Sequence, residues 1–99
     1  MGTELNVDMS EIRRAIVTLS IEKVLLDMGK PVYDRVIEKL ETKHNCYLTD
    51  CYANPSCLQN VLKELFGRSS ESIIKSIGKN LEEFSDNKQI GRFLDIITS

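Results

Sequence analysis

The sequence predicts an all-α fold, a single-domain bundle of about five helices spanning residues 1–99. Apolar residues recur at steps of three and four almost throughout, and no stretch alternates with the period of two typical of a half-buried strand. Glycine and proline interrupt this pattern at short intervals, as they do between helices joined by short connections. A length of 99 residues suits one domain, in which we expect residues 1–7 to be flexible.

The first predicted helix begins near Asp8, which forms an aspartate version of the capping box with Glu11. It ends at Gly29, because glycine accepts a left-handed conformation and the nearby Pro31 cannot continue the hydrogen-bond ladder. Apolar residues at helical spacing are expected to face the core: Met9, Ile12, Ile16, Leu19, Ile21, Val24, Leu25 and Met28. Three further residues widen this face, so that we expect the helix to be buried on more than one side: Ala15, Val17 and Leu26.

The second predicted helix covers residues 31–42, and its proline suits a first helical turn. Helical periodicity then fails over residues 43–54, which predicts a long connection. The third predicted helix follows with Asn54 as its N-terminal cap and Pro55 at its first position. It ends at Gly67.

The fourth predicted helix is capped by Ser69 or Ser70, and its apolar face extends to Phe84. A turn follows, in which Asp86 is expected to cap the last helix. The last helix carries an apolar face that reaches Ile97 near the end of the chain.

Composition and charge argue against several classes of protein. A net charge of −2 and a pI near 5.4 lack the strongly basic face of a dedicated nucleic-acid binder. No apolar run approaches the roughly 18–20 residues that span a bilayer, and residues 1–10 lack the pattern of a signal peptide, so we expect a cytoplasmic protein without a membrane partner. No P-loop, GxGxxG or HExxH motif occurs, and we expect neither an enzyme nor a bound cofactor.

Residues 44–57 hold all three cysteines, the single histidine and two of the three tyrosines. One interpretation is a zinc site in which His44, Cys46, Cys51 and Cys57 are tetrahedral ligands, although the spacing lacks the CxxC pair of most zinc sites. A second interpretation is a nucleophilic cysteine activated by His44, for which the sequence offers no orienting partner.

A third interpretation is a thiol switch. Cys57 falls in the first turn of the third predicted helix, where unpaired N–H groups and the helix dipole favour a thiolate. Cys51 lies six residues earlier, and oxidation is expected to form a Cys51–Cys57 or a Cys46–Cys51 disulfide. The interpretation that we favour from sequence is structural: the cysteines, with Leu48 and Tyr52, pack the connection over the bundle as apolar side chains.

The favoured functional interpretation is a non-catalytic interaction or regulatory module. The first and last helices look more apolar than a monomer of this size needs, which predicts a homodimer or docking on another protein. The alternative is a redox- or metal-responsive sensor built on Cys46, Cys51 and Cys57. A weaker alternative is a helix-turn-helix DNA-binding regulator within residues 55–84, whose second helix presents only a weakly basic face.

Three stretches resemble a family of small all-helical archaeal proteins that has no assigned activity: residues 29–33, residues 46–52 with Pro55, and residues 62–67. The similar region covers residues 16–84, most of the chain. The resemblance implies an archaeal cytosolic protein, in which an intracellular disulfide is more admissible. It transfers no catalytic residue, and Cys57 lies outside the family pattern, which weakens the case for a three-cysteine metal site.

Overall fold

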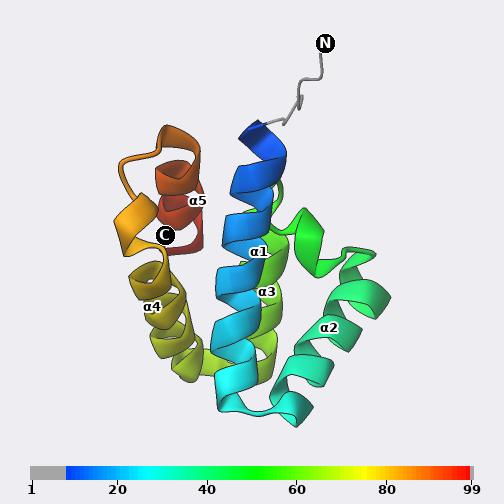
Figure 1. Cartoon of the computed structure of the whole chain (residues 1–99). Coiled ribbons are helices and arrows are strands. Elements are labelled where there is room, and N and C mark those ends of the chain that lie inside the picture. The colour runs from blue at the N-terminus through cyan, green and yellow to red at the C-terminus, as the bar shows by residue number, and fades with distance from the viewer. Residues whose placement is uncertain (1–8, 99) are drawn as a thin grey trace.

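The structure, a computed structural model, describes residues 9–98 and forms five α-helices within them (Figure 1). The α-helices are α1 (Met9–Met28), α2 (Lys30–His44), α3 (Pro55–Phe66), α4 (Ser70–Asn80) and α5 (Lys88–Thr98). Three short 3₁₀ turns accompany them: η1 (Leu48–Asp50), η2 (Gly67–Ser69) and η3 (Glu82–Phe84). No strand occurs between residues 9 and 98, so the prediction of an all-α bundle of about five helices is confirmed.

The helices surround one hydrophobic core. In Figure 1, α1 runs down the front of the bundle, with α3 behind it, α2 on one side and α4 and α5 on the other. Gly29 separates α1 from α2 with a φ of 123°, a conformation that favours glycine. The Gly29 carbonyl accepts hydrogen bonds from the N–H groups of Val32 and Tyr33, both at 3.1 Å, so one residue ends α1 and begins α2.

The caps of the helices differ in part from the prediction. Asn54 and Ser69 lie at the N-cap positions of α3 and α4, but neither side chain makes a capping hydrogen bond. The prediction that Asp86 caps the last helix is wrong, because α5 begins later and its cap is Asn87. The Asn87 Oδ1 atom accepts hydrogen bonds from the N–H groups of Gln89 and Ile90, at 3.0 and 3.1 Å. The predicted capping box at Asp8 and the predicted flexibility of residues 1–7 lie outside the described residues.

The fourth helix is shorter than predicted. It ends at Asn80, and the N–H of Leu81 is shared between the carbonyls of Ile77 and Gly78 at 3.1 and 3.2 Å. The next turn, η3, is a 3₁₀ turn, in which each N–H donates to the carbonyl three residues earlier. Gly78 weakens the helix locally, and the two glutamates of η3 would be unfavourable at the negative end of a longer helix. The buried side chain of Leu81 nevertheless keeps this segment on the core.

The largest correction concerns which face of α1 is buried. The buried residues are Val17, Ser20, Ile21, Val24 and Leu25. Six residues that the sequence analysis assigned to the core face are exposed instead: Met9, Ile12, Ala15, Leu19, Leu26 and Met28. The helix carries apolar residues around most of its circumference, and the neighbouring helices cover only part of it. The expectation that α1 is buried on more than one side is therefore wrong.

The last helix, by contrast, uses its apolar face within the chain. Ile90, Phe93 and Ile97 are all at most 2% exposed, and Leu94 is half-buried against the same core. The apolar end of the sequence is thus covered by α3 and α4. Of the two terminal helices that looked too apolar for a monomer, α1 is the one that retains large exposed apolar side chains.

Candidate functional site

The connection between α2 and α3, residues 45–54, is folded inward from its first residue. Asn45 ends α2 in the left-handed conformation with φ 50°, which asparagine tolerates better than most residues. Directly after it, the Cys46 N–H donates to the Leu40 carbonyl at 3.0 Å. The 3₁₀ turn η1 then forms, and the Asp50 carboxylate accepts the Tyr47 N–H at 3.0 Å. Within this folded connection, three side chains are buried against the bundle: Cys46, Leu48 and Cys51.

The structure brings the three cysteines together. Cys46 is 5% exposed, Cys51 is fully buried, and Cys57 is half-buried in the first turn of α3. The Cys46 and Cys51 sulfurs lie 3.5 and 3.8 Å from the same carbonyl oxygen, that of Tyr47. We call these residues, Cys46, Cys51 and Cys57, the three-thiol cluster; all three are free thiols.

The environment of the cluster favours protonated thiols. Burial, followed by the hydrogen bond and charge of Cys57, raises the pKa of Cys46 to about 11. Burial raises the pKa of Cys51 even further above its ordinary value, and the Asp50 carboxylate acts in the same direction on both. The thiols of Cys46 and Cys51 are therefore protonated at physiological pH, so that neither is a resting thiolate nucleophile.

His44 lies two residues before the first cysteine of the connection. It is the last residue of α2 and half-buried, and its Nε2 atom is buried without a hydrogen-bond partner. It is not among the groups that shift the pKa of Cys46 or Cys51. Within residues 9–98, no group of three or more histidine, cysteine, aspartate or glutamate side chains is arranged to hold a metal ion. This geometry supports neither the zinc interpretation nor a Cys–His nucleophile.

The structural interpretation of the cysteines is confirmed. Cys46, Leu48 and Cys51 are buried members of the hydrophobic core, and Tyr52 and Cys57 pack against it while partly exposed. The connection thus closes the core between α2 and α3 with small apolar side chains.

A second feature, which sequence reasoning missed, is the exposed side of α1. We define the α1 outer face as six residues along this helix: Met9, Ile12, Ile16, Leu19, Lys23 and Leu26. Five of them are exposed, and Ile16 is half-buried against the core. Met9 is 58% exposed, Leu19 is 61% exposed, and Leu26 is 44% exposed. The spacing of three and four residues was visible in the sequence, but it was assigned to the core. The outer face is therefore an apolar surface on the described part of the chain.

Two hydrogen bonds fix the rotation of α1 that leaves this face outward. Arg13 Nε donates to the Tyr52 hydroxyl at 3.1 Å, which ties α1 to the connection. The Tyr33 hydroxyl donates to the Glu22 carboxylate at 3.1 Å, which ties α1 to α2. Both bonds are partly buried, so the turn of the helix is held by polar contacts as well as by its buried apolar residues.

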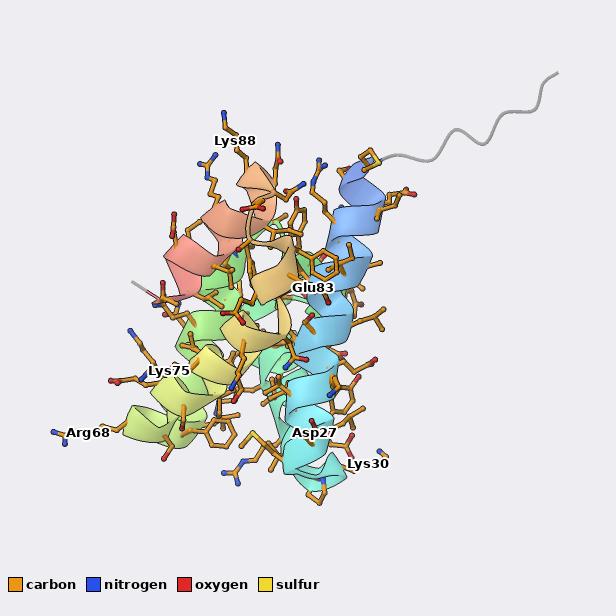
Figure 2. All side chains as sticks on the ribbon, turned by 60° about the vertical axis from the view of Figure 1, so that its left-hand side comes forward. Asp27, Lys30, Arg68, Lys75, Glu83 and Lys88 are labelled. Atoms are coloured by element: carbon orange, nitrogen blue, oxygen red, sulfur yellow. The ribbon has the colours of Figure 1, made fainter. Side chains whose placement is uncertain are left out.

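An open groove of about 470 Å³ lies between α1 and α4. Val24 and Ile73 are among its apolar lining residues, and Asp27 and Lys79 among its charged ones. Figure 2 shows Asp27 near the C-terminal end of α1 and Lys75 projecting from α4 away from α1. Asp27 is largely exposed and pairs with Lys23 at 3.8 Å. Asp27 and Lys79 are both exposed side chains at the edge of this groove, and we assign no chemistry to it.

Two further observations concern the helix-turn-helix alternative and the membrane. The segment α3–η2–α4 has the order of a helix-turn-helix, but the described residues show no concentration of basic side chains on α4, which carries two lysines and one glutamate. None of the described helices combines the length and the apolar content needed to cross a membrane.

No protein-family model, curated protein sequence or solved structure matches this chain. The resemblance to small archaeal proteins stays a prediction. Function is accordingly inferred from the three-thiol cluster and the α1 outer face alone.

Proposed function

We propose that this chain is a non-catalytic interaction module with a regulatory or scaffolding role, and that it self-associates through the α1 outer face as an antiparallel homodimer. The observation that supports the proposal is the set of large exposed apolar side chains along one side of a single helix. Monomeric proteins rarely expose contiguous apolar patches larger than a few hundred Å², and patches above that size mark interaction sites.

The spacing of the face suits another helix as its occupant. Its six positions follow one another at steps of three, four, three, four and three residues. This is the repeat with which two helices pack side by side in coiled coils, since it keeps one seam turned toward the partner. Lys23 interrupts the apolar run, but its long stem can lie along the seam while its amine reaches solvent and Asp27.

A second copy of this chain can cover the α1 outer face, because the spacing of the six positions is the same when the helix is read in the opposite direction. A two-fold axis requires that if residue i contacts residue j, then j also contacts i. An antiparallel pairing centred between residues 17 and 18 meets this condition. It produces three kinds of facing pair, each with at least one apolar residue: Met9 with Leu26, Ile12 with Lys23, and Ile16 with Leu19.

The size of the face sets the expected strength of the dimer. At a rise of about 1.5 Å per residue the face is about 26 Å long, and a helix is about 10 Å wide. The resulting footprint of about 260 Å² is smaller than the roughly 800 Å² per partner of a standard stable interface. We therefore expect reversible pairing that dissociates at micromolar concentration. The free thiols also fit a reducing compartment, and we propose the cytoplasm as the place of action.

The test compares two apolar residues of equal exposure on the same helix. Leu26 and Met28 are each 44% exposed, but Leu26 belongs to the outer face and Met28 lines the α1–α4 groove. Sedimentation velocity over a concentration series should show a dimer of the unchanged chain. Leu26→Gln should raise the dimer dissociation constant about tenfold, the effect of losing one well-placed apolar contact, and Leu19→Gln should raise it at least as much.

Met28→Gln is the matched control and should leave the dissociation constant unchanged. A chain that stays monomeric up to millimolar concentration contradicts the proposal. Equal weakening by Leu26→Gln and Met28→Gln contradicts the assignment of the face. Circular dichroism of each variant should show unchanged helicity, since all three side chains are exposed.

A further inference from the structure

We propose that the Lys23–Asp27 pair of α1 determines how two copies of this chain meet, by admitting the antiparallel pairing and excluding the parallel one. The inference rests on the proposed self-association through the α1 outer face, and it adds which residues select the orientation of the partner. The Lys23 Nζ and Asp27 Oδ2 atoms lie 3.8 Å apart, and the two side chains are 64% and 71% exposed. The apolar residues of the face cannot make this selection, because their spacing suits a partner helix that runs in either direction.

Lys23 is the charged residue among the six that define the α1 outer face. In a parallel pairing in register each residue faces its own copy, so the two Lys23 amines would lie side by side at the seam. In the antiparallel pairing Lys23 faces Ile12, and the two lysines are separated along the axis by the rise between positions 12 and 23, about 16 Å. This separation exceeds the Debye length of about 8 Å at physiological ionic strength. Repulsion between the two lysines is therefore strong only in the parallel pairing.

Two acidic residues beside the seam act in the same direction. Glu22 directly precedes Lys23 and Asp27 follows it by one turn, which places the two carboxylates on opposite flanks of the seam. The Glu22 carboxylate is held there by the Tyr33 hydroxyl, which donates to it at 3.1 Å. Flanking residues meet across a parallel pair, which would put Glu22 of each copy beside Asp27 of the other. In the antiparallel pairing Glu22 lies at the level of Arg13 of the other copy, about 21 Å along the axis from that copy's Asp27.

Lys23 also lowers the affinity of the antiparallel dimer. A polar residue at one seam position specifies the orientation of a helix pair at a cost in stability. Each antiparallel dimer contains two Lys23 side chains, and each of them faces Ile12 in place of an apolar residue. Replacing the lysine by leucine should therefore have two opposite consequences: the dimer becomes tighter, and its orientation becomes less specific.

The experiment compares the unchanged full chain with the double variant Lys23→Leu/Asp27→Asn, which removes both charges of the pair. Sedimentation velocity over a concentration series measures the dimer dissociation constant. Orientation is measured by photo-crosslinking, with a benzophenone amino acid in place of Met9, in an equal mixture of chains labelled with light and heavy nitrogen. The labels identify crosslinks between copies by mass. Such crosslinks reach the segment around Leu26 in an antiparallel pair and the segment around position 9 in a parallel pair.

The unchanged chain should crosslink only to the segment around Leu26 of the other copy. The double variant should bind about tenfold more tightly or better, because each dimer gains two apolar contacts, and should crosslink to both segments. The matched control is Lys30→Leu/Asp34→Asn, which alters an exposed lysine–aspartate pair of the same spacing on α2, with the Nζ and Oδ2 atoms 3.1 Å apart. It should change neither the dissociation constant nor the crosslinks.

Three outcomes would overturn the inference and leave self-association standing. They are a parallel crosslink in the unchanged chain, a double variant that keeps the original dissociation constant or crosslinks only to the segment around Leu26, and a control variant with the same effects as the double variant. A chain that stays monomeric up to millimolar concentration would instead contradict the proposed self-association, and this inference with it. Far-ultraviolet circular dichroism of each variant should show unchanged helicity, since the altered side chains are exposed.

Discussion

The α1 outer face and the connection of residues 45–54 differ in burial, and each differs from what its residues and its regularity would suggest. The helix carries leucine, isoleucine and methionine, yet leaves several of them exposed, with Leu19 at 61%. The connection is an irregular segment, yet it places Cys46, Leu48 and Cys51 in the hydrophobic core. Burial here follows from where an element lies among its neighbours and not from its regularity.

The connection can be buried because its backbone polar groups find partners within the chain. The Asp50 and Cys51 N–H groups donate to the Tyr47 and Leu48 carbonyls at 2.9 and 3.1 Å, and the Asn54 N–H donates to the Asp50 carbonyl at 2.9 Å. A loop without such bonds would pay a desolvation penalty in the core. The helix has its backbone satisfied on every side, so no comparable constraint decides which of its faces is covered.

The largest expected effect comes from truncating the connection's apolar side chain. Leu48→Ala should lower the free energy of unfolding by about 2–5 kcal/mol, because it leaves a cavity where the connection closes the core. Urea denaturation of the reduced chain measures this change. A loss below about 1 kcal/mol would mean that the Leu48 side chain does not contribute to the stability of the hydrophobic core.

The next effect is a loss of stability at alkaline pH. Burial is the main cause that raises the pKa of Cys46 from its ordinary 9.0 to about 11. Below pH 9 the thiol is protonated in both states, and its contribution to stability is fully present. Between pH 9 and 11 the unfolded chain releases this proton first, so stability falls, by roughly 2–3 kcal/mol in total.

This loss is measured by denaturation of the unchanged chain and of Cys46→Ala at each pH, with a reductant present. The variant should lose part of the alkaline slope and keep the part due to Cys51, whose pKa burial also raises. Parallel slopes for the two chains would show that Cys46 is accessible to water in the folded state.

A smaller effect is expected where the two regions meet. Tyr52→Phe removes the hydroxyl that accepts the Arg13 hydrogen bond, and should lower the free energy of unfolding by about 0.5–1.5 kcal/mol. Tyr47→Phe is the matched control, since the Tyr47 side chain is 63% exposed, and should change stability by a few tenths of a kcal/mol at most, about the scatter of surface substitutions. Thermal unfolding of both variants measures this difference. Equal changes in the unfolding temperature would show that the Arg13–Tyr52 hydrogen bond does not stabilise the contact between α1 and the connection.

The smallest effect is expected on α1. Leu19→Ala, measured at a concentration where the chain is monomeric, should change the free energy of unfolding by no more than about 0.5 kcal/mol, because the side chain is exposed and alanine favours a helix. Ile21→Ala on the same helix is the buried counterpart, and should be destabilising by about 2–5 kcal/mol. If the two substitutions cost the same, α1 is rotated differently from the orientation described.

Much of the fold could be predicted from local signals. Gly29 and Gly67 end their helices with positive φ, as their positions in the sequence indicated. The cluster of cysteines was recognised as the unusual segment, and its packing role was anticipated. How deeply each cysteine is buried could not be predicted from spacing, because it depends on how the connection after Asn45 packs on the bundle. The cap at Asn87 was missed by one residue, since aspartate and asparagine are equally good candidates.

By itself the sequence determined that the chain is helical, roughly where the helices begin and end, and which segment holds the thiols. These properties depend on the spacing of apolar residues and on glycine, proline and capping residues, which act over one or two turns. Only the tertiary structure decided which side of α1 faces water and how deeply each cysteine is buried. Both depend on contacts between segments far apart in the chain: Tyr52 with Arg13 and Tyr33 with Glu22 for the rotation of α1, and the connection against α3 for the thiols.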